Sequence, residues 1–237
     1  MRLGIFKEQD ITHLPEPVQN HFRVSGIIGQ SIMSKSLVHV PSASIFRSKN
    51  SKPMILDYTL HLFGDRPVRL AYMNNSMFGI PFEVFDSFQD GEGVMKGVLG
   101  KIFTLFNETG SEMNRGQLLT YLGEFFLIPS AIFNEHVTWE TIDANHVRAT
   151  ITYGELSGSG IFTFNENGFV QSFRTKERAA IRPDGSITHP EWSAVYEGWT
   201  RGENGMHLPS NIKAIWHEQD GDFIYFESTR GFTVEFS

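Results

Sequence analysis

One acidic residue lies in an apolar setting, where a carboxylate either pairs with a cation or takes part in binding or acid–base chemistry. Glu124 falls within a largely apolar stretch with helical spacing, next to Phe125 and Phe126. A buried carboxylate needs a partner, because burial without one raises its pKa. Arg174 and Arg178 are the candidate partners in the sequence. The simpler interpretation is an ion pair that ties a helix to a sheet, and the functional one is a polar anchor inside an apolar cavity.

Aromatic residues form the second set of candidates. The chain has 21 Phe, and aromatic residues make up 13% of it. Phe fills protein cores without needing a hydrogen-bond partner, and it also lines apolar pockets. Core packing is the default interpretation, and a ligand cavity is the functional alternative. Together with Glu124 and Arg178, the candidate ligand-binding residues are Phe126, Trp139, Tyr153, Phe162, Phe164, Tyr196, Trp216 and Tyr225.

Other chemistries lack their usual sequence patterns. The chain has no Cys, which excludes disulfides, zinc fingers and thiolate nucleophiles. The glycines at 91–100 match neither the Walker nor the dinucleotide-binding glycine spacing. No H-E-x-x-H zinc-binding pattern occurs among the histidines. The Ser-Gly-Ser-Gly stretch at 157–160 lies within a strand pattern rather than on a strand–turn–helix elbow. We therefore predict no catalytic residue, no metal site and no cofactor, and an enzyme is the less favoured class.

The charge balance argues against a nucleic-acid partner. The 237 residues carry a net charge of −7 with an isoelectric point near 5.7, whereas a surface that follows phosphates is rich in Lys and Arg. No apolar run approaches the roughly 18 residues of a membrane-spanning helix. The N-terminus lacks the apolar core of a secretory signal, so the chain, if complete as given, is expected to be soluble and cytoplasmic. A trimmed leader, the oligomeric state and the identity of any ligand stay open.

One long helical pattern stands among strand patterns. It runs from Ser111 to Phe133, with Leu118, Leu122 and Phe125 on one apolar stripe. Pro129 is expected to end or kink it. A shorter helix is predicted after the Leu-Pro-Glu-Pro-Val stretch at 14–18, ending near residue 25, because proline favours the first helical turn.

The remaining elements are predicted strands. Residues 54–63 and 146–153 alternate apolar and polar side chains, and Asn-Gly at 167–168 is a strong hairpin signal. Further strands are predicted at 36–40, 44–47, 68–72, 82–88, 94–99, 101–106, 154–164, 168–176, 194–201, 212–218, 223–229 and 231–236. The predicted fold is α+β: a strongly curved, mainly antiparallel sheet, or incomplete barrel, with one main helix on its concave face and a short N-terminal helix. Residues 1–237 are expected to form a single domain.

Short motifs are spread over most of the chain. They are Leu14-Pro15-Glu16-Pro17-Val18, Asp86 with Asp90-Gly91-Glu92-Gly93-Val94-Met95, Gly116-Gln117-Leu118-Leu119-Thr120-Tyr121-Leu122, Trp139 with Asp143, Phe162-Thr163-Phe164 with Gly168, and Gly205, Pro209, Trp216 and Tyr225. Together they resemble an uncharacterised bacterial family of domain-of-unknown-function proteins. That pattern has Glu where Gln117 stands here, which weakens any catalytic role for the position. The order of strands, helix and strands is in turn similar to the lipoprotein-carrier half-barrel, a curved antiparallel sheet around helices.

Three function hypotheses remain. The leading one is non-enzymatic binding of an apolar or amphipathic, lipid-like small molecule in a cavity between sheet and helix. The second is an enzyme that uses Glu124 with Arg178 in that cavity. The third is a structural or protein-interaction module whose interior is full. A cavity lined by aromatic side chains favours the first, and convergent titratable groups around a void favour the second.

Overall fold

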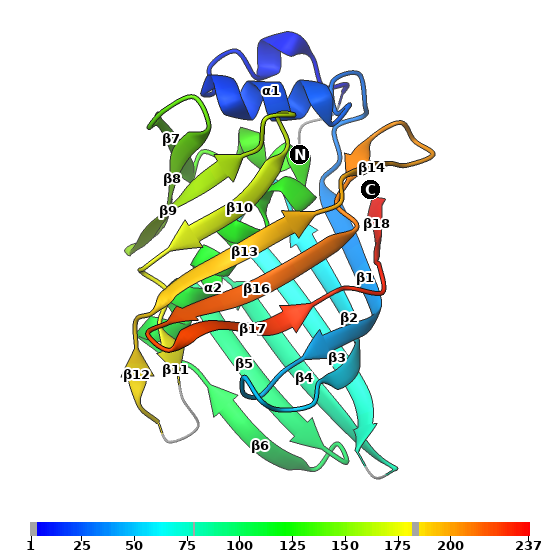
Figure 1. Cartoon of the computed structure of the whole chain (residues 1–237), viewed down its shortest axis with the longest axis vertical. Coiled ribbons are helices and arrows are strands. Elements are labelled where there is room, and N and C mark those ends of the chain that lie inside the picture. The colour runs from blue at the N-terminus through cyan, green and yellow to red at the C-terminus, as the bar shows by residue number, and fades with distance from the viewer. Residues whose placement is uncertain (1–3, 78, 182–184) are drawn as a thin grey trace.

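The computed structural model describes residues 4–77, 79–181 and 185–237 (Figure 1). Within them, one antiparallel sheet of 14 strands has the order β6-β5-β4-β3-β2-β1-β17-β16-β13-β10-β9-β8-β7, and β18 also pairs with β1. Its strands are β1 (Lys35–Ile45), β2 (Met54–Phe63), β3 (Val68–Met77), β4 (Ile80–Gln89), β5 (Glu92–Leu99), β6 (Phe103–Glu108), β7 (Val137–Thr141), β8 (His146–Tyr153), β9 (Leu156–Phe164), β10 (Val170–Thr175), β13 (Glu191–Glu197), β16 (Asn211–Glu218), β17 (Gly221–Glu227) and β18 (Thr233–Phe236).

Among the described residues, two small hairpins, two α-helices and three short 3₁₀ helices, the first at Glu8–Asp10, complete the fold. The hairpins are β11 (Ala180–Ile181) with β12 (Ile187–Thr188), and β14 (Thr200–Arg201) with β15 (His207–Leu208). The α-helices are α1 (Glu16–Val24) and α2 (Ser111–Gly123). In the described part of the chain, neither helix has the length and apolar character needed to cross a bilayer.

Alternating side chains explain the first hairpin. On β2, Leu56, Tyr58, Leu60 and Leu62 are buried, and the residues between them are partly exposed, as the period of two for a half-buried strand requires. The strands predicted at 36–40 and 44–47 are one continuous strand, β1. Its pairing with β2 shifts register between Val40 and Ala43, because a β-bulge can interrupt the ladder without ending the strand.

The main helix is shorter than predicted. The α-helix ends at Gly123, and two 3₁₀ turns continue the segment at Phe125–Leu127 and Pro129–Phe133. Pro129 begins the second turn, because it has no N–H to continue an α-helical ladder. Leu118, Leu122 and Phe125 are all fully buried, so the predicted apolar stripe does face the core.

Helix α2 touches both ends of the sheet. It contacts β4 and β5 near one edge and β8, β9 and β10 near the other. Eight strands separate β5 from β9 in the strand order, so a flat sheet would hold them roughly 40 Å apart at about 4.8 Å per strand. The sheet must therefore bend strongly (Figure 1). The approach to β5 is close, because a Cβ atom on Gly93 would lie 2.6 Å from the carbonyl oxygen of Met113.

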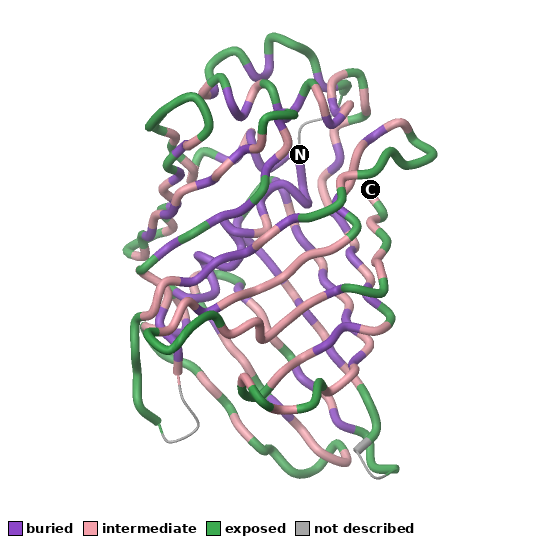
Figure 2. The backbone as a smooth tube through the Cα atoms, viewed as in Figure 1, coloured by how far each residue is buried: buried purple, intermediate pink, exposed green. Residues whose placement is uncertain are grey.

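Burial is uneven along this sheet. Figure 2 shows buried segments concentrated around α2 and the strands behind it, whereas β16 and β17 are largely of intermediate exposure. Helix α1 packs at one end, where Val18 and Phe22 are fully buried. The described residues thus divide into a tightly packed region around α2 and α1 and a less covered region along β5, β6, β16 and β17.

Candidate functional site

A buried arginine organises the polar centre of the fold. Arg69, on β3, donates from Nε to Glu124 Oε2 at 2.9 Å and from Nη2 to Oε1 of the same carboxylate at 3.1 Å. Its Nη1 donates to Asp86 Oδ2 at 3.0 Å and to Gln117 Oε1 at 2.6 Å. The amide of Gln117 also donates to Asp86. The Arg69 side chain is only 2% exposed, and those of both acids are 14% exposed.

This cluster has two carboxyl groups, Glu124 and Asp86, but only one cation, Arg69. Burial raises the pKa of Glu124; the attraction of Arg69 offsets this rise only in part, and repulsion by the Asp86 carboxylate adds to it. Burial lowers the pKa of Arg69, but Asp86 and Glu124 outweigh it and hold the value well above the ordinary one. Burial likewise raises the pKa of the neighbouring Tyr58 well above its ordinary value. The cluster therefore favours a charged arginine with one carboxylate shifted toward its neutral form.

The partner predicted for Glu124 was wrong. Neither Arg174 nor Arg178 bonds to it: Arg174 pairs with Glu191 at 3.0 Å, and Arg178 donates to Thr120 Oγ1. Arg69 was missed because it stands between Val68 and Leu70, in a strand where apolar residues were expected to face the core. The one weak sign of its burial in the sequence was that Ala71 and Met73, at alternate positions from Arg69, are small or flexible apolar residues. Both are buried on the same face of β3 as Arg69.

A second group centres on Arg178. Its guanidinium carbon lies 4.8 Å from the ring centroid of Trp192 and 4.9 Å from that of Trp216, distances at which a cation interacts with an aromatic face. Its Nε donates to Thr120 Oγ1 at 3.0 Å. Trp192 Nε1 donates to the hydroxyl of Tyr225 at 2.9 Å, and the rings of Trp216 and Tyr225 stack at 6.0 Å. Three predicted site residues, Arg178, Trp216 and Tyr225, thus lie together, joined by Trp192 and Thr120, which were not predicted as site residues.

Four further predicted site residues form a different, packed cluster. Phe126 lies 5.0 Å from Phe162, 5.9 Å from Phe164 and 6.5 Å from Trp139 between ring centroids. Phe162 is fully buried, and Phe126 and Phe164 are 3% exposed. His21 of α1 closes this cluster at 4.6 Å from Phe126. These side chains pack on one another around the end of the α2 segment.

The remaining two predicted site residues lie apart from both groups. Tyr153 contacts His136 and Phe88, with ring centroids 5.0 and 6.1 Å away. The buried Tyr196 donates its hydroxyl hydrogen to the carbonyl of Gly123 at the end of α2. Burial also raises the pKa of Tyr196 far above its ordinary value, so its hydroxyl stays protonated as a donor.

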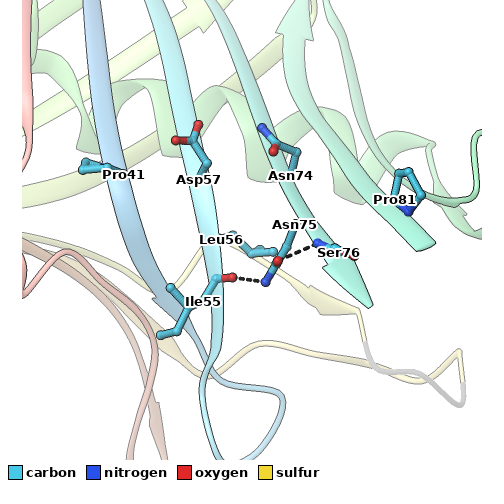
Figure 3. Close-up of a pocket in the computed structure, with 8 residues that line it drawn as sticks. All are labelled: Pro41, Ile55, Leu56, Asp57, Asn74, Asn75, Ser76 and Pro81. Atoms are coloured by element: carbon cyan, nitrogen blue, oxygen red, sulfur yellow. Dashed lines mark hydrogen bonds between the residues drawn. The ribbon is translucent and has the colours of Figure 1, made fainter. Parts of the chain in front are cut away.

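Two open grooves lie on the described surface, and neither is lined by a predicted site residue. The first, of about 490 Å³, is lined by Pro41, Ile55, Leu56, Asp57, Asn74, Asn75, Ser76 and Pro81 from β1 to β4 (Figure 3). The second, of about 700 Å³, is lined by Thr188, His189, Pro190, His217, Glu218 and Gln219. Among the described residues, no cluster of three or more His, Asp and Glu is arranged to hold a metal ion.

The second groove borders a hydrogen-bond chain with the order of a catalytic triad. His217 Nε2 lies 2.9 Å from Ser193 Oγ, and its Nδ1 lies 2.7 Å from Asp222 Oδ1. Ser193 is fully buried in the middle of β13, so a substrate cannot reach its hydroxyl. Strand β13 also pairs on both sides, with β10 and β16, which leaves its amides without free N–H groups to stabilise an oxyanion. The Ser193–His217–Asp222 hydrogen bonds are therefore a polar contact between neighbouring strands of the sheet.

Comparisons with known proteins place the chain in a family. No curated protein matches it. One similar solved structure is a domain from Vibrio parahaemolyticus provisionally assigned as an outer membrane lipoprotein-sorting protein. It is 11% identical, the match covers 86% of each chain, and the TM-score is 0.42; likeness at this level does not establish a shared function. The model of a family of unknown function, DUF6544, matches residues 4–228, which confirms the resemblance predicted from the motifs. The chain belongs to the DUF6544 family.

Proposed function

We propose that this protein binds an apolar or amphipathic, lipid-like small molecule and catalyses no reaction. In this proposal the chain is one domain, the curved sheet is an incomplete barrel, and α2 lies on its concave face. The ligand would occupy the part of that face that α2 leaves uncovered, between β5–β6 and β16–β17.

The observation that carries the proposal is two sets of apolar side chains, one on β5 and β6 and one on β17, that contact the core but stay partly exposed. Met95, Leu99 and Phe106 on β5 and β6, and Phe223, Tyr225 and Phe226 on β17, all pack against buried residues yet remain half-buried. On the β5–β6 hairpin, Ile102, Phe103 and Leu105 are 78%, 67% and 53% exposed. Clustered exposed apolar side chains are typical of binding sites.

The packing around Phe126 supports a ligand position away from that cluster. Phe126, Phe162 and Phe164 are buried by one another, so they serve the core. Arg178 and Tyr225 are instead partly exposed, and Trp216, which is 7% exposed, contacts both of them. Of the residues predicted to contact a ligand, we therefore keep Arg178, Trp216 and Tyr225.

The enzyme alternative receives no specific support. Both carboxylate oxygens of Glu124 accept hydrogen bonds from Arg69, and Arg178 is turned to Thr120. A general base has to reach the proton it removes, and a carboxylate engaged on both oxygens in a buried cluster is poorly placed to do so.

Binding of a fluorescent apolar dye tests the proposal. We expect saturable binding near one dye per chain, displacement by a fatty acid, and a rise in melting temperature with ligand, because a ligand that binds only the folded state stabilises it. Trp216→Ala and Phe106→Ala should weaken dye binding. Trp199→Ala is the matched control, since this half-buried Trp packs near His21 at 5.1 Å, in the cluster around Phe126.

Two results would contradict the proposal. One is native protein that binds neither dye nor any lipid tested. The other is equal loss of dye binding in Trp216→Ala and Trp199→Ala, which would locate the dye outside the uncovered region. Either result would move the structural or protein-interaction hypothesis to first place.

A further inference from the structure

Arg178 is held in one orientation with part of its hydrogen-bonding capacity unused. The two indoles of Trp192 and Trp216 flank the guanidinium, and Thr120 fixes its Nε end. Within residues 4–77, 79–181 and 185–237, no acidic side chain forms an ion pair with it, and its two terminal nitrogens have no hydrogen-bond partner. The residue is partly exposed, so these nitrogens are accessible.

The flanking aromatic residues are themselves fixed. Trp192 is held by its hydrogen bond to Tyr225, and Trp216 by stacking on the same ring. Gly123 allows the close approach of Trp192 to α2, because a Cβ atom there would lie 3.0 Å from the indole. A guanidinium immobilised in this way loses little conformational freedom when it binds, which strengthens binding.

The geometry points to Arg178 as an oxyanion subsite that recognises the carboxylate or phosphate head of the amphipathic ligand. This inference rests on the proposed function and specifies the class of ligand. The two terminal nitrogens of a guanidinium form a planar fork that matches two oxygens of a carboxylate or phosphate. The apolar tail would then lie against the partly exposed Phe223, which is paired with the buried Trp216 across β16 and β17.

The surrounding charges favour an anion over a cation. The Glu124 carboxylate, whose pKa the charge of Arg178 lowers, is already bonded to Arg69, as is Asp86. Among the described residues no acidic side chain is bonded to the fork, so an incoming oxyanion displaces no ion pair there. An ammonium head group would be repelled by Arg178, and an alcohol would leave the charge of the guanidinium unmatched.

A head-group series on one chain length tests the inference. The probes are dodecanoate, dodecyl phosphate, dodecanol and dodecyltrimethylammonium, titrated into purified protein below their micellar concentrations and followed by tryptophan fluorescence and calorimetry. We expect at least one of the two anions to bind about tenfold or more tightly than dodecanol, as a charge-assisted hydrogen-bond pair allows. The anion preferred, carboxylate or phosphate, identifies the source of the head group.

Substitutions of Arg178 test whether its guanidinium causes the preference for anions. Arg178→Gln should reduce anion affinity about tenfold while changing dodecanol affinity less than about twofold, and Arg178→Lys should recover only part of the loss, because an ammonium keeps the charge but not the fork. Arg174→Gln is the matched control, an exposed arginine on β10 paired with Glu191, and should bind all probes as the native protein does.

The outcomes separate the two proposals. Tighter binding of anions that is lost in Arg178→Gln supports the subsite. Equal affinity for dodecanol and both anions in the native protein overturns the subsite while leaving the binding function intact, and this comparison holds even if Arg178→Gln fails to fold. Failure of all four probes to bind overturns the proposed function itself.

Discussion

Removing Arg69 is the sharpest perturbation of the buried polar cluster. Arg69→Met keeps an unbranched apolar side chain in place but deletes four hydrogen bonds, two to Glu124 and one each to Asp86 and Gln117. It leaves two carboxylates buried together without a cation. Loss of one partner from a buried ion pair typically costs about 3–5 kcal/mol, and we expect a loss of that size in the free energy of unfolding at pH 7.

The loss of unfolding free energy in Arg69→Met should depend on pH in a way that identifies buried carboxyl groups as its cause. Without Arg69, burial and repulsion by the Asp86 carboxylate should raise the pKa of Glu124 in the folded state further above that of the unfolded chain. A carboxyl group with a raised folded pKa imposes no penalty below the unfolded pKa, and its penalty grows as the pH rises from the unfolded pKa to the folded pKa. The deficit of Arg69→Met should therefore be largest at pH 7 and shrink as the pH falls toward 4.

Urea unfolding at a series of pH values, followed by tryptophan fluorescence, measures both quantities. Arg148→Met is the control, since Arg148 forms an exposed pair with Glu140 at 2.9 Å and should lose less than about 1 kcal/mol. Glu124→Gln should be milder than Glu124→Ala, because both leave Arg69 paired with Asp86 but only Gln keeps an oxygen that can accept a hydrogen bond from Arg69. A deficit for Arg69→Met below about 1 kcal/mol, or one that does not change with pH, would refute the assignment of a buried, anion-rich cluster.

Three smaller predictions follow from burial. Leu122→Ala should cost about 2–5 kcal/mol, and a loss under about half a kcal/mol would mean that α2 is peripheral. Burial lowers the pKa of His21 to about 3; since the unfolded chain binds this proton near pH 6.5, stability should fall as pH drops below that value, by about 2 kcal/mol at pH 5. His21→Gln should flatten that slope, and an unchanged slope would assign it to other groups. Gly123→Ala should displace Trp192, whose ring would lie 3.0 Å from the new Cβ, and an unchanged emission spectrum would contradict this packing.

Local patterns predicted the elements well where one physical rule dominates. The alternation of Leu56, Tyr58, Leu60 and Leu62 identified β2, because a half-buried strand shows its period directly. The stripe through Leu118 and Leu122 likewise identified the buried face of α2. The end of α2 at Gly123 was not predicted, since apolar residues continue beyond it and only tertiary packing decides between α-helix and 3₁₀ turns.

The polar centre could not be predicted from local patterns. Arg69 looks like a surface residue in its strand, and its burial depends on Asp86 from β4 and Glu124 from the end of α2 reaching the same point. Those contacts span 17 and 55 residues, so no local spacing encodes them. Arg178 was predicted as a site residue, but its setting between Trp192 and Trp216 depends on the pairing of β13 with β16.

Native mass spectrometry of the intact protein tests the central claim most directly. Protein purified without detergent, sprayed under gentle conditions and then dissociated, should release an amphipathic molecule bound one per chain, and added dodecanoate should replace it at the same stoichiometry. Trp216→Ala should carry less of either molecule than Trp199→Ala does. A native protein that carries no such molecule and takes up none at saturating dodecanoate would contradict the claim that the uncovered face of the sheet is a binding site.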